Sequence, residues 1–374
     1  MIYFDNAATG GYKPPEVTET VINTVKYLSA NPGRSGHRLA VTGAKTVFAT
    51  RTAFADTFGC PPERVIFTKN CTEALNTAIF GICRKGNHVI TTVYEHNSVL
   101  RPLYALKNAG IITFDAVSAK SCEDLADAVE EKLRPETALI ICTAVSNVTG
   151  EVMPIRRIGQ IAEKHGILFL VDGAQGGGHI DLNMKDNKID VLALAGHKGI
   201  YGIMGSGVLM FKENVDIAPF CYGGTGTTTF EEGQPAFYPE RLEAGTLNLP
   251  AIAALGEGLR YAFDNFYGFS RILLRYTEKL TDGLKRYGRV KCYSSPNPAG
   301  IVSFSADGYD SESLSDLLGN EYDIAVRGGF HCAPLCHKFL GTAENGLVRV
   351  SVCPHNSERE INYFLTAIGK ILRG

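Results

Sequence analysis

The sequence predicts an α/β fold whose main sheet is mostly parallel, together with a smaller α+β domain. Between about residues 60 and 212, short β-branched runs alternate with longer amphipathic stretches, which is typical of parallel strands joined by covering helices. After about residue 250 the pattern changes to long helices with few strands, and no internal repeat is found. We therefore predict a large domain formed by residues 14–250 and a small domain formed by residues 1–13 and 251–374.

The composition is that of an ordinary globular protein with a sizeable core. The chain has 374 residues, of which 45% are hydrophobic and 20% are charged. Its 37 Lys and Arg residues nearly balance its 39 Asp and Glu residues, giving a net charge of −2. This balance gives no electrostatic reason to expect nucleic acid or an anionic membrane as a partner. Small molecules and proteins are the expected partners.

The sequence also bears on where the protein works. The N-terminus has no basic start followed by an apolar stretch of signal-peptide length, and no apolar run reaches the ~18 residues that cross a bilayer. Ten cysteines are scattered through the chain without the dense spacing of a disulfide framework. We expect a cytoplasmic protein whose thiols are mostly reduced.

The elements of the large domain are expected in a regular order. Two helices, 14–29 and 39–58, are separated by the turn-rich sequence ANPGRSGHR, in which Pro and Gly interrupt the helical period. Seven apolar, β-branched runs predict strands at 65–68, 88–92, 111–114, 138–143, 167–171, 191–194 and 206–211. Amphipathic stretches between these strands predict helices at 72–82, 97–110, 122–133 and 155–166.

The rest of the chain departs from this alternation. The Gly/Thr-rich stretch CYGGTGTTTFEEGQP predicts an ordered but mobile loop. Beyond it, helices are expected at 252–263, 270–287 and 358–372, with strands at 300–305 and 347–352. These elements form the predicted small domain.

Two neighbouring strands end in polar residues of complementary chemistry. Asp172 follows an apolar run, where a carboxylate is costly to bury unless it meets a cation such as a protonated pyridine nitrogen. Lys198 follows the next apolar run, where a desolvated amine can react with an aldehyde cofactor. Ligands of open α/β sheets bind at the carboxyl ends of the strands. A lone Asp or Lys at a strand end is more often a helix cap or a solvated charge, but here both occur together.

Other strand ends supply candidate contacts to a flat, phosphorylated ring. Cys71 and Thr72 begin a helix, where free backbone N–H groups attract anions, although Thr followed by Glu is equally a plain helix cap. His96 can stack on a ring. Asn147 and Gln175 can hydrogen-bond a ring oxygen, or can be turn residues.

With these residues in place, the chain resembles the class V family of fold-type I pyridoxal phosphate enzymes. Within that family it is similar to the branch of cysteine desulfurases and selenocysteine lyases, from FDNAAT near the N-terminus to RVSVCPHNSEREI near the C-terminus. The resemblance implies that pyridoxal 5'-phosphate is the cofactor and that Lys198 bonds to its aldehyde. It further implies that Asp172 pairs with the pyridinium nitrogen and that His96 stacks on the ring and helps to move protons.

The resemblance also implies how the rest of the cofactor is held. Thr72 and His197 are expected at the phosphate, joined across a homodimer interface by Thr246 of EAGTLN. Gln175 and Asn147 are expected at the ring hydroxyl. The active sites are then expected between the two domains of a homodimer.

The segment VRGGFHCAPL resembles the active-site loop of the desulfurases in the short-loop branch. This makes Cys332 the expected sulfur acceptor, whose thiolate attacks the substrate sulfur. We expect His331 and Arg327 to favour that thiolate. The alternatives are a buried structural thiol, or a metal site with Cys336 and His337, although the second ligand pair typical of zinc is not evident. We expect no metal.

Three arginines are candidates for substrate binding. Arg349, between apolar residues, resembles the family residue that grips the substrate α-carboxylate, a task that suits a bidentate guanidinium. Arg327 lies on the cysteine loop, and Arg34 or its neighbour His37 is expected to reach the site from the second subunit. Asn147 is expected to contact the substrate as well as the cofactor.

The chain departs from the family pattern at three points. Ala195 and Gly196 precede the His-Lys pair where a hydroxyl residue is common before the Gly, and Cys71 stands where Thr is usual. One or two phosphate contacts are therefore in doubt. Phe330 replaces the His often found two places before the cysteine, which is expected to affect selectivity.

The sequence thus predicts an enzyme that converts L-cysteine to L-alanine and passes the sulfur from Cys332 to an acceptor protein. Selenocysteine lyase, acting on L-selenocysteine and supplying a selenium acceptor, shares the scaffold and stays open. So do a class V aminotransferase or lyase that does not use the thiol, and a slow sulfur-relay component that depends on a partner.

Overall fold

The structure is a computed structural model that describes residues 1–119 and 121–373, and its largest sheet has the strand order β2-β8-β7-β6-β5-β3-β4. Its strands are β2 (Val65–Thr68), β3 (Asn87–Thr92), β4 (Ile112–Val117), β5 (Thr137–Thr143), β6 (Leu168–Asp172), β7 (Val191–Ala195) and β8 (Gly207–Phe211). Strand β8 pairs antiparallel with β2 and β7, and the other neighbours pair in parallel. The predicted mostly parallel sheet of seven strands is confirmed.

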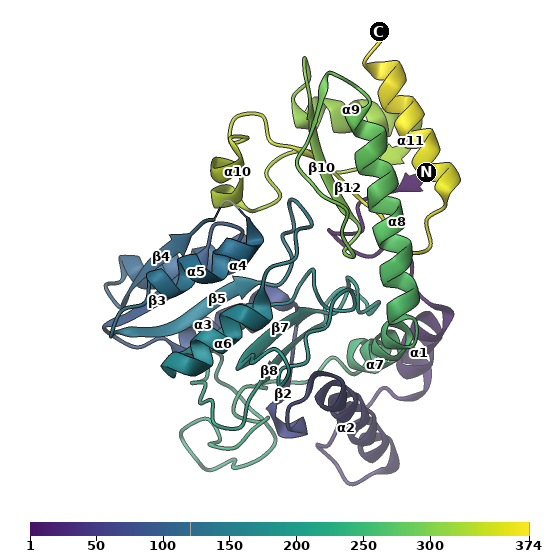
Figure 1. Ribbon diagram of the computed structural model, residues 1–374. Helices are drawn as coiled ribbons and strands as arrows, with labels where there is room; N and C mark the ends of the chain where they lie inside the picture. The colour runs from purple at the N-terminus through teal and green to yellow at the C-terminus, as the bar shows by residue number, and fades with distance from the viewer. Residues whose placement is uncertain (120, 374) are drawn as a thin grey trace.

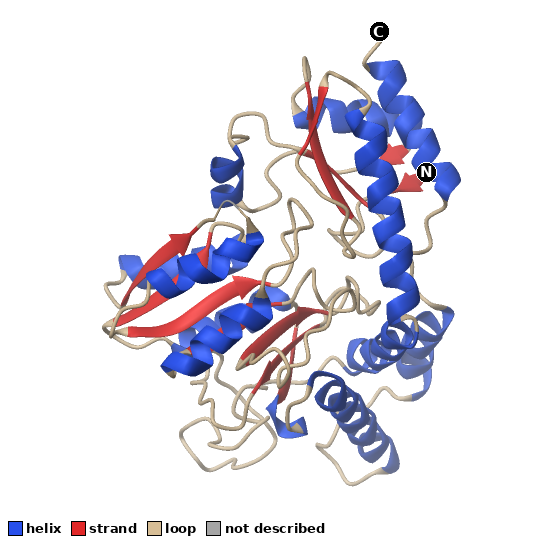
Figure 2. Ribbon diagram, in the orientation of Figure 1, coloured by secondary structure: helices blue, strands red, loops and turns tan. Residues whose placement is uncertain are grey.

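This sheet is covered on both faces, which explains the near-continuous apolar runs of its central strands. Along β5, Ile140 and Cys142 belong to one hydrophobic cluster while Leu139 and Ile141 belong to another, because successive side chains point to opposite faces. Figures 1 and 2 show the helices that follow these strands, laid against the sheet. They are α3 (Cys71–Ile82), α4 (Asn97–Asn108), α5 (Cys122–Glu131) and α6 (Ile155–His165).

Three further helices pack beside the antiparallel end of the sheet. They are α1 (Pro15–Tyr27), α2 (Arg38–Phe58) and α7 (Leu249–Asp264), with the short 3₁₀ helix η1 (Pro62–Arg64) leading into β2. Figure 1 shows α1 and α2 lying close to α7, in agreement with the many α1–α7 and α2–α7 contacts. The segment from Lys212 to Asn248 that precedes α7 contains no helix or strand, so the predicted Gly/Thr-rich loop lies within a long irregular segment.

The C-terminal third forms a second layer around the antiparallel sheet β12-β10-β9. Its strands are β9 (Val290–Cys292), β10 (Ile301–Ala306) and β12 (Val348–Ser351), and its helices are α8 (Phe266–Lys285), α9 (Ser311–Tyr322), α10 (Pro334–Leu340) and α11 (Glu358–Ile371). The N-terminal strand β1 (Ile2–Tyr3) pairs in parallel with β11 (Ile324–Ala325), so the first residues lie beside this part of the chain (Figure 1). The exact domain boundaries stay a prediction.

The arrangement places the carboxyl ends of β5, β6 and β7 next to segments of the smaller sheet. The backbone of Asp5 bridges to Ser351 at the end of β12, and the N–H of Asn97 at the start of α4 donates to the carbonyl of Cys332. Chain segments more than two hundred residues apart therefore meet at one edge of the large sheet. No described helix combines the length and apolarity needed to cross a lipid bilayer.

Candidate active site

A cavity of about 210 Å³ lies at this edge, between the large sheet and the loop that carries Cys332. Strand ends, helix starts and the N-terminal segment all contribute to its wall. The predicted site residues that line it are Cys71, Thr72, His96, Asn147, Asp172, Gln175, His197, Lys198, Arg327 and Arg349. The structure thus brings together, in one chain, nearly all of the residues singled out from the sequence.

Asp172 and Lys198 form the charged centre of the cavity. Asp172 ends β6 and is only 3% exposed, and its Oδ1 accepts hydrogen bonds from Ala174 N at 2.9 Å and Cys71 Sγ at 3.5 Å. Burial lowers the pKa of Lys198, while the nearby Asp172 carboxylate partly opposes that shift. A buried amine with a lowered pKa is more often neutral and therefore nucleophilic.

A chain of hydroxyl groups orients the imidazole of His96. Ser98 donates its backbone N–H to His96 Nδ1 at 3.0 Å, and its Oγ lies 2.8 Å from Nδ1 and 2.7 Å from Thr72 Oγ1. Because burial lowers the pKa of His96, the ring is neutral, and a Nδ1 that accepts leaves the hydrogen on Nε2. Ser98 was not singled out from the sequence, although its place two residues after His96 at a helix start is a usable signal.

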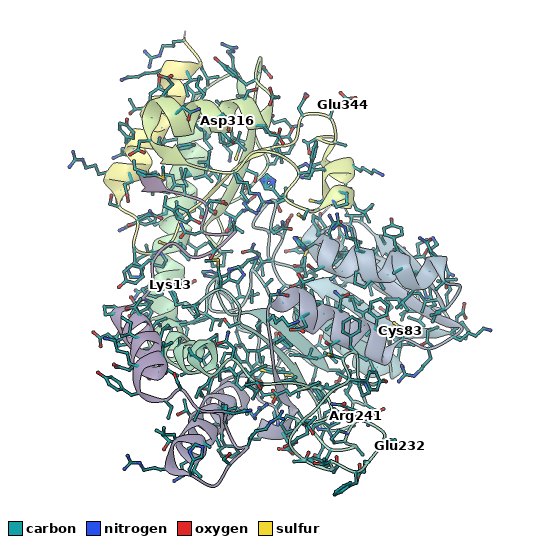
Figure 3. All side chains as sticks on the ribbon, turned by 180° about the vertical axis from the view of Figure 1, so that it is seen from behind. Lys13, Cys83, Glu232, Arg241, Asp316 and Glu344 are labelled. Carbon is teal, nitrogen blue, oxygen red and sulfur yellow. The ribbon has the colours of Figure 1, made fainter. Side chains whose placement is uncertain are left out.

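The N-terminal segment holds His197, the residue that precedes Lys198 in the chain. The carbonyl of His197 accepts hydrogen bonds from Gly10 N at 3.0 Å and Lys13 Nζ at 3.1 Å, and His197 Nδ1 lies 3.0 Å from Thr9 Oγ1. Lys13 lies in the short segment between β1 and α1 (Figure 3). Burial lowers the pKa of Lys13 to about 8 and that of His197 to about 4, so His197 is neutral. Neither Thr9 nor Lys13 was identified from the sequence.

The two amide side chains in the cavity wall have protein partners. Asn147 Nδ2 donates to the carbonyl of His331 at 2.7 Å, and Gln175 Nε2 donates to the carbonyl of Ala7 at 2.9 Å. Asn147 therefore holds the cysteine loop and Gln175 holds the N-terminal segment. The side-chain oxygen of each amide stays available as an acceptor. The predicted contacts of Asn147 and Gln175 with a ring hydroxyl stay a prediction.

Arg349 lies in β12 and is only 1% exposed. Its Nη2 contacts Asp5 Oδ1 at 3.0 Å and its Nη1 donates to the carbonyl of Asn147 at 3.0 Å, while Nε is buried without a partner in the described chain. The backbone of Arg327 pairs with that of Arg349, so two guanidinium groups reach the same cavity. Such a pair suits a carboxylate ligand. Asp5 was part of the quoted motif FDNAAT, but its pairing with Arg349 was not foreseen.

The cysteine loop has a left-handed backbone at two consecutive residues. His331 and Cys332 have φ values of 51° and 57°, which cost energy for residues that carry a Cβ. Two hydrogen bonds from the large sheet side hold this conformation: Asn147 Nδ2 to His331 O at 2.7 Å and Asn97 N to Cys332 O at 2.7 Å. Cys332 is exposed, whereas Cys336 in α10 is fully buried and burial raises its pKa to about 12.

His331 corrects one expectation about this loop. Its ring is buried next to Arg349 and Arg327, and burial together with these cations lowers its pKa to about 2. The imidazole is therefore neutral, and the expectation that it adds positive charge to favour a thiolate at Cys332 is wrong. Arg327 and Arg349 remain as the cations next to this loop. Among residues 1–119 and 121–373, no group of three or more His, Cys, Asp or Glu side chains could hold a metal ion.

Two predicted residues lie away from this cavity. Thr246 accepts a hydrogen bond from Asn31 Nδ2 at 3.4 Å, and Arg34 Nη2 donates to the carbonyls of Gly224 and Gly245, each at 3.0 Å. Arg34 lines a separate, larger cavity of about 430 Å³ next to α2. Within one chain, therefore, neither residue reaches the site that contains Lys198.

Comparisons with known proteins identify the family of this chain. The Aminotransferase class-V family matches residues 2–364. "Probable cysteine desulfurases" of Methanothermobacter thermautotrophicus and Pyrococcus abyssi are 32% and 33% identical, over 96% and 100% of this chain and 92% and 94% of theirs. The apo structure of a cysteine desulfurase from Thermococcus onnurineus is similar with a TM-score of 0.91 at 32% identity, covering 100% of this chain and 95% of that one. The chain therefore belongs to the class-V aminotransferase family, among the relatives of the cysteine desulfurases.

Proposed function

We propose that this protein is a pyridoxal phosphate-dependent cysteine desulfurase, which converts L-cysteine to L-alanine and leaves the sulfur as a persulfide on Cys332. The proposal depends above all on one observation: a half-buried lysine, a buried carboxylate and two arginines share a cavity against the loop that carries Cys332. The names of the relatives support the same activity.

The donor set of the cavity fits pyridoxal 5'-phosphate. Asp172 offers a buried carboxylate to a pyridinium nitrogen, and Lys198 offers an amine whose pKa is lowered by burial. The N-terminus of α3, at Cys71 and Thr72, faces the same cavity and suits a phosphate. When bound, the cofactor supplies an electron-withdrawing ring that weakens bonds at the substrate Cα. We propose that His96 stacks on that ring and that His197 joins the phosphate contacts.

The side chains then have distinct tasks toward the substrate. Arg349 and Arg327 bind the α-carboxylate, with Asn147 beside them, while Lys198 and His96 exchange protons with the substrate. The thiolate of Cys332 attacks the substrate sulfur, so that an S–S bond forms as the Cβ–S bond breaks and its electron pair stays with the substrate carbon. Protonation of that carbon yields alanine. The high pKa of Cys336 argues against a relay through that thiol.

A homodimer completes this proposal. Arg34 and Thr246 lie outside the cavity of their own chain, and the face beside Arg34 also carries Phe48, which is 62% exposed. Figure 3 labels Glu232 and Arg241, which lie on the long irregular segment between β8 and α7. A second copy that covered this face would carry Arg34 and Thr246 to the neighbouring active site. We further propose a cytoplasmic location, domains formed by residues 14–250 and by 1–13 with 251–374, and a protein acceptor for the persulfide.

The test compares alanine formation from L-cysteine and from L-selenocysteine by the holoenzyme and by Cys332→Ala, with Cys336→Ala as the matched control. We expect Cys332→Ala to abolish turnover of cysteine, and Cys336→Ala to retain it. Turnover of selenocysteine alone by the unmodified protein would replace the proposal with a selenocysteine lyase. Turnover of cysteine that survives Cys332→Ala would instead favour a class V reaction that does not use the thiol.

A further inference from the structure

Cys71 is one of the points at which the chain departs from the family pattern, and the structure gives its thiol a partner. Its Sγ lies 3.5 Å from Asp172 Oδ1, and both residues line the active-site cavity. Cys71 is 7% exposed and Asp172 is 3% exposed, so water competes little for this contact. The thiol therefore touches the carboxylate that the proposed function assigns to the ring nitrogen of the cofactor.

The protonation of the pair fixes the direction of this hydrogen bond. Burial and the adjacent Asp172 carboxylate raise the pKa of Cys71 well above its ordinary value, so the thiol keeps its hydrogen. A carboxylate that pairs with a cation is ionised and can only accept. Cys71 is thus the donor and Asp172 Oδ1 is the acceptor.

The start of α3 holds Cys71 beside Asp172. Asn70 caps this helix, its Oδ1 accepting from Glu73 N at 2.9 Å, and Cys71 is the first helical residue. A Cβ at Gly207 in β8 would lie 2.5 Å from the carbonyl carbon of Asn70, so the helix start packs against the sheet more closely than a side chain would allow. The thiol is carried to Asp172 by a helix start that has little freedom to shift.

The two oxygens of Asp172 have different surroundings. Oδ1 accepts from Cys71 Sγ and from Ala174 N, the latter at 2.9 Å. Oδ2 accepts from no donor in the described chain, and it is not among the buried atoms that lack a partner, so it keeps accessible surface in the cavity that Asp172 lines. Oδ2 is the oxygen available to a ring nitrogen, while Oδ1 is held by the protein.

A donor on Oδ1 changes how strongly Oδ2 attracts a cation. A hydrogen bond to a carboxylate stabilises its negative charge. This stabilisation is larger when Oδ2 is unpaired than when a pyridinium N–H already contacts it, because both donors then share one charge. The thiol thus makes Asp172 less dependent on a ring nitrogen.

We propose that Cys71 is a positioning residue that holds Asp172 by Oδ1 and moderates the attraction of Oδ2 for the ring nitrogen of the bound cofactor. This inference rests on the proposed function, which places pyridoxal 5'-phosphate in the cavity. It gives Cys71 no part as a nucleophile, and Cys332 remains the residue that takes the sulfur.

The contact is tested by the infrared S–H stretch of the cofactor-free, full-length protein, taken as the difference between the unmodified protein and Cys71→Ala. The matched control is Cys83→Ala, which removes a buried thiol at the other end of α3 whose charged neighbour is Arg84 rather than a carboxylate. We expect the Cys71 band at lower frequency than the Cys83 band, because donation to a carboxylate weakens the S–H bond. Asp172→Asn should raise the frequency of the Cys71 band. Equal frequencies for the two thiols would overturn the inference.

The effect on the cofactor is tested by the dissociation constants of pyridoxal 5'-phosphate and of its 1-deaza analogue, in which C–H replaces the ring nitrogen, measured by equilibrium dialysis. We expect the preference for pyridoxal 5'-phosphate to be about 2- to 5-fold larger in Cys71→Ala than in the unmodified protein, the lower part of the range for one hydrogen bond. Cys71→Ser, which keeps a donor, and Cys83→Ala should retain the preference of the unmodified protein. An unchanged or smaller preference in Cys71→Ala would refute the role of Cys71.

Failure of this inference is distinguishable from failure of the proposed function. If the unmodified protein does not bind pyridoxal 5'-phosphate, both fall. If it binds the cofactor and forms alanine from cysteine while Cys71→Ala leaves the preference unchanged, only the role of Cys71 is lost. If Cys71→Ala does not fold, the isosteric variants Cys71→Val and Cys71→Thr carry the same test, because only Thr keeps a donor. Equal preferences in these two variants would contradict the inference.

Discussion

Replacing Arg51 with Met should destabilise the protein by about 3–5 kcal/mol, because it leaves a buried carboxylate without its cation. Arg51 in α2 binds Glu243 through two hydrogen bonds, Nη1 to Oε1 at 3.0 Å and Nη2 to Oε2 at 2.8 Å. The N–H of Phe67 in β2 donates to the same Oε1 at 2.7 Å. Both charged side chains are 6% exposed, so water cannot replace the lost guanidinium. Glu243 also anchors the segment that carries Thr246, so cofactor affinity should fall as well.

The assay is urea unfolding followed by circular dichroism, with the double variant Arg51→Met, Glu243→Gln as the matched control. The neutral amide keeps an acceptor for Phe67 N, so the double variant should recover at least half of the loss. Burial raises the pKa of Glu243 and Arg51 opposes that shift. For an acid whose pKa is higher in the folded than in the unfolded state, ionisation of the buried group lowers the free energy of unfolding. This loss is absent below the unfolded pKa and grows as pH rises. The deficit of Arg51→Met should therefore be smaller at pH 5 than at pH 8. A deficit below about 1 kcal/mol, or one independent of pH, would refute the reasoning.

Three further predictions concern Asn147 in the cavity wall, Glu95 next to His96 in the chain, and Gly178, which packs against Gly199. Asn147→Leu removes the hydrogen-bond donor to His331 O and should lower the free energy of unfolding by about 1–3 kcal/mol. It should also speed proteolysis of the cysteine loop. An unchanged cleavage rate would contradict the idea that this hydrogen bond holds the loop in place. Burial raises the pKa of Glu95 to about 8, so ionising this carboxylate destabilises the folded protein increasingly as pH rises from 5. Glu95→Gln removes that cost. Its free energy of unfolding should therefore rise relative to that of the unmodified protein by up to about 4 kcal/mol between pH 5 and pH 9, as measured by urea midpoints. Gly178→Ala places a Cβ against the Gly199 carbonyl at a φ of 81° and should lower Tm and cofactor binding; an unaltered Tm would show that this contact can relax.

The sequence predicted most of the large sheet because its strands are apolar on both faces and its helices are strongly amphipathic. It missed α10, which has seven residues, and α9, whose 12 residues bury only two apolar side chains, Leu314 and Leu318. It also missed β1 and β11, which have two residues each and exist only because they pair with each other. Elements of that length have no periodicity to detect.

The site residues also divide into those that local sequence can indicate and those that only contacts between remote segments define. Asp172, Lys198 and Cys332 could be chosen from strand ends and a loop motif, because their chemistry is local. The hydrogen bond from Asn147 to His331 and the pairing of Asp5 with Arg349 join residues 184 and 344 positions apart, and no local pattern records such contacts. The role first given to His331 failed because the sequence shows a histidine but not its burial, and burial beside cations decides its charge.

The sequence by itself determined the family, the alternation of strands and helices, and the residue types that cofactor and sulfur chemistry require. These depend on hydrophobic periodicity and on functional groups, which are properties of the chain. Only the tertiary structure decided which of those groups share a cavity, which protonation states they hold, and that the loop of Cys332 is kept in a strained conformation. These depend on distances and on the exclusion of water, which arise only when remote segments pack together.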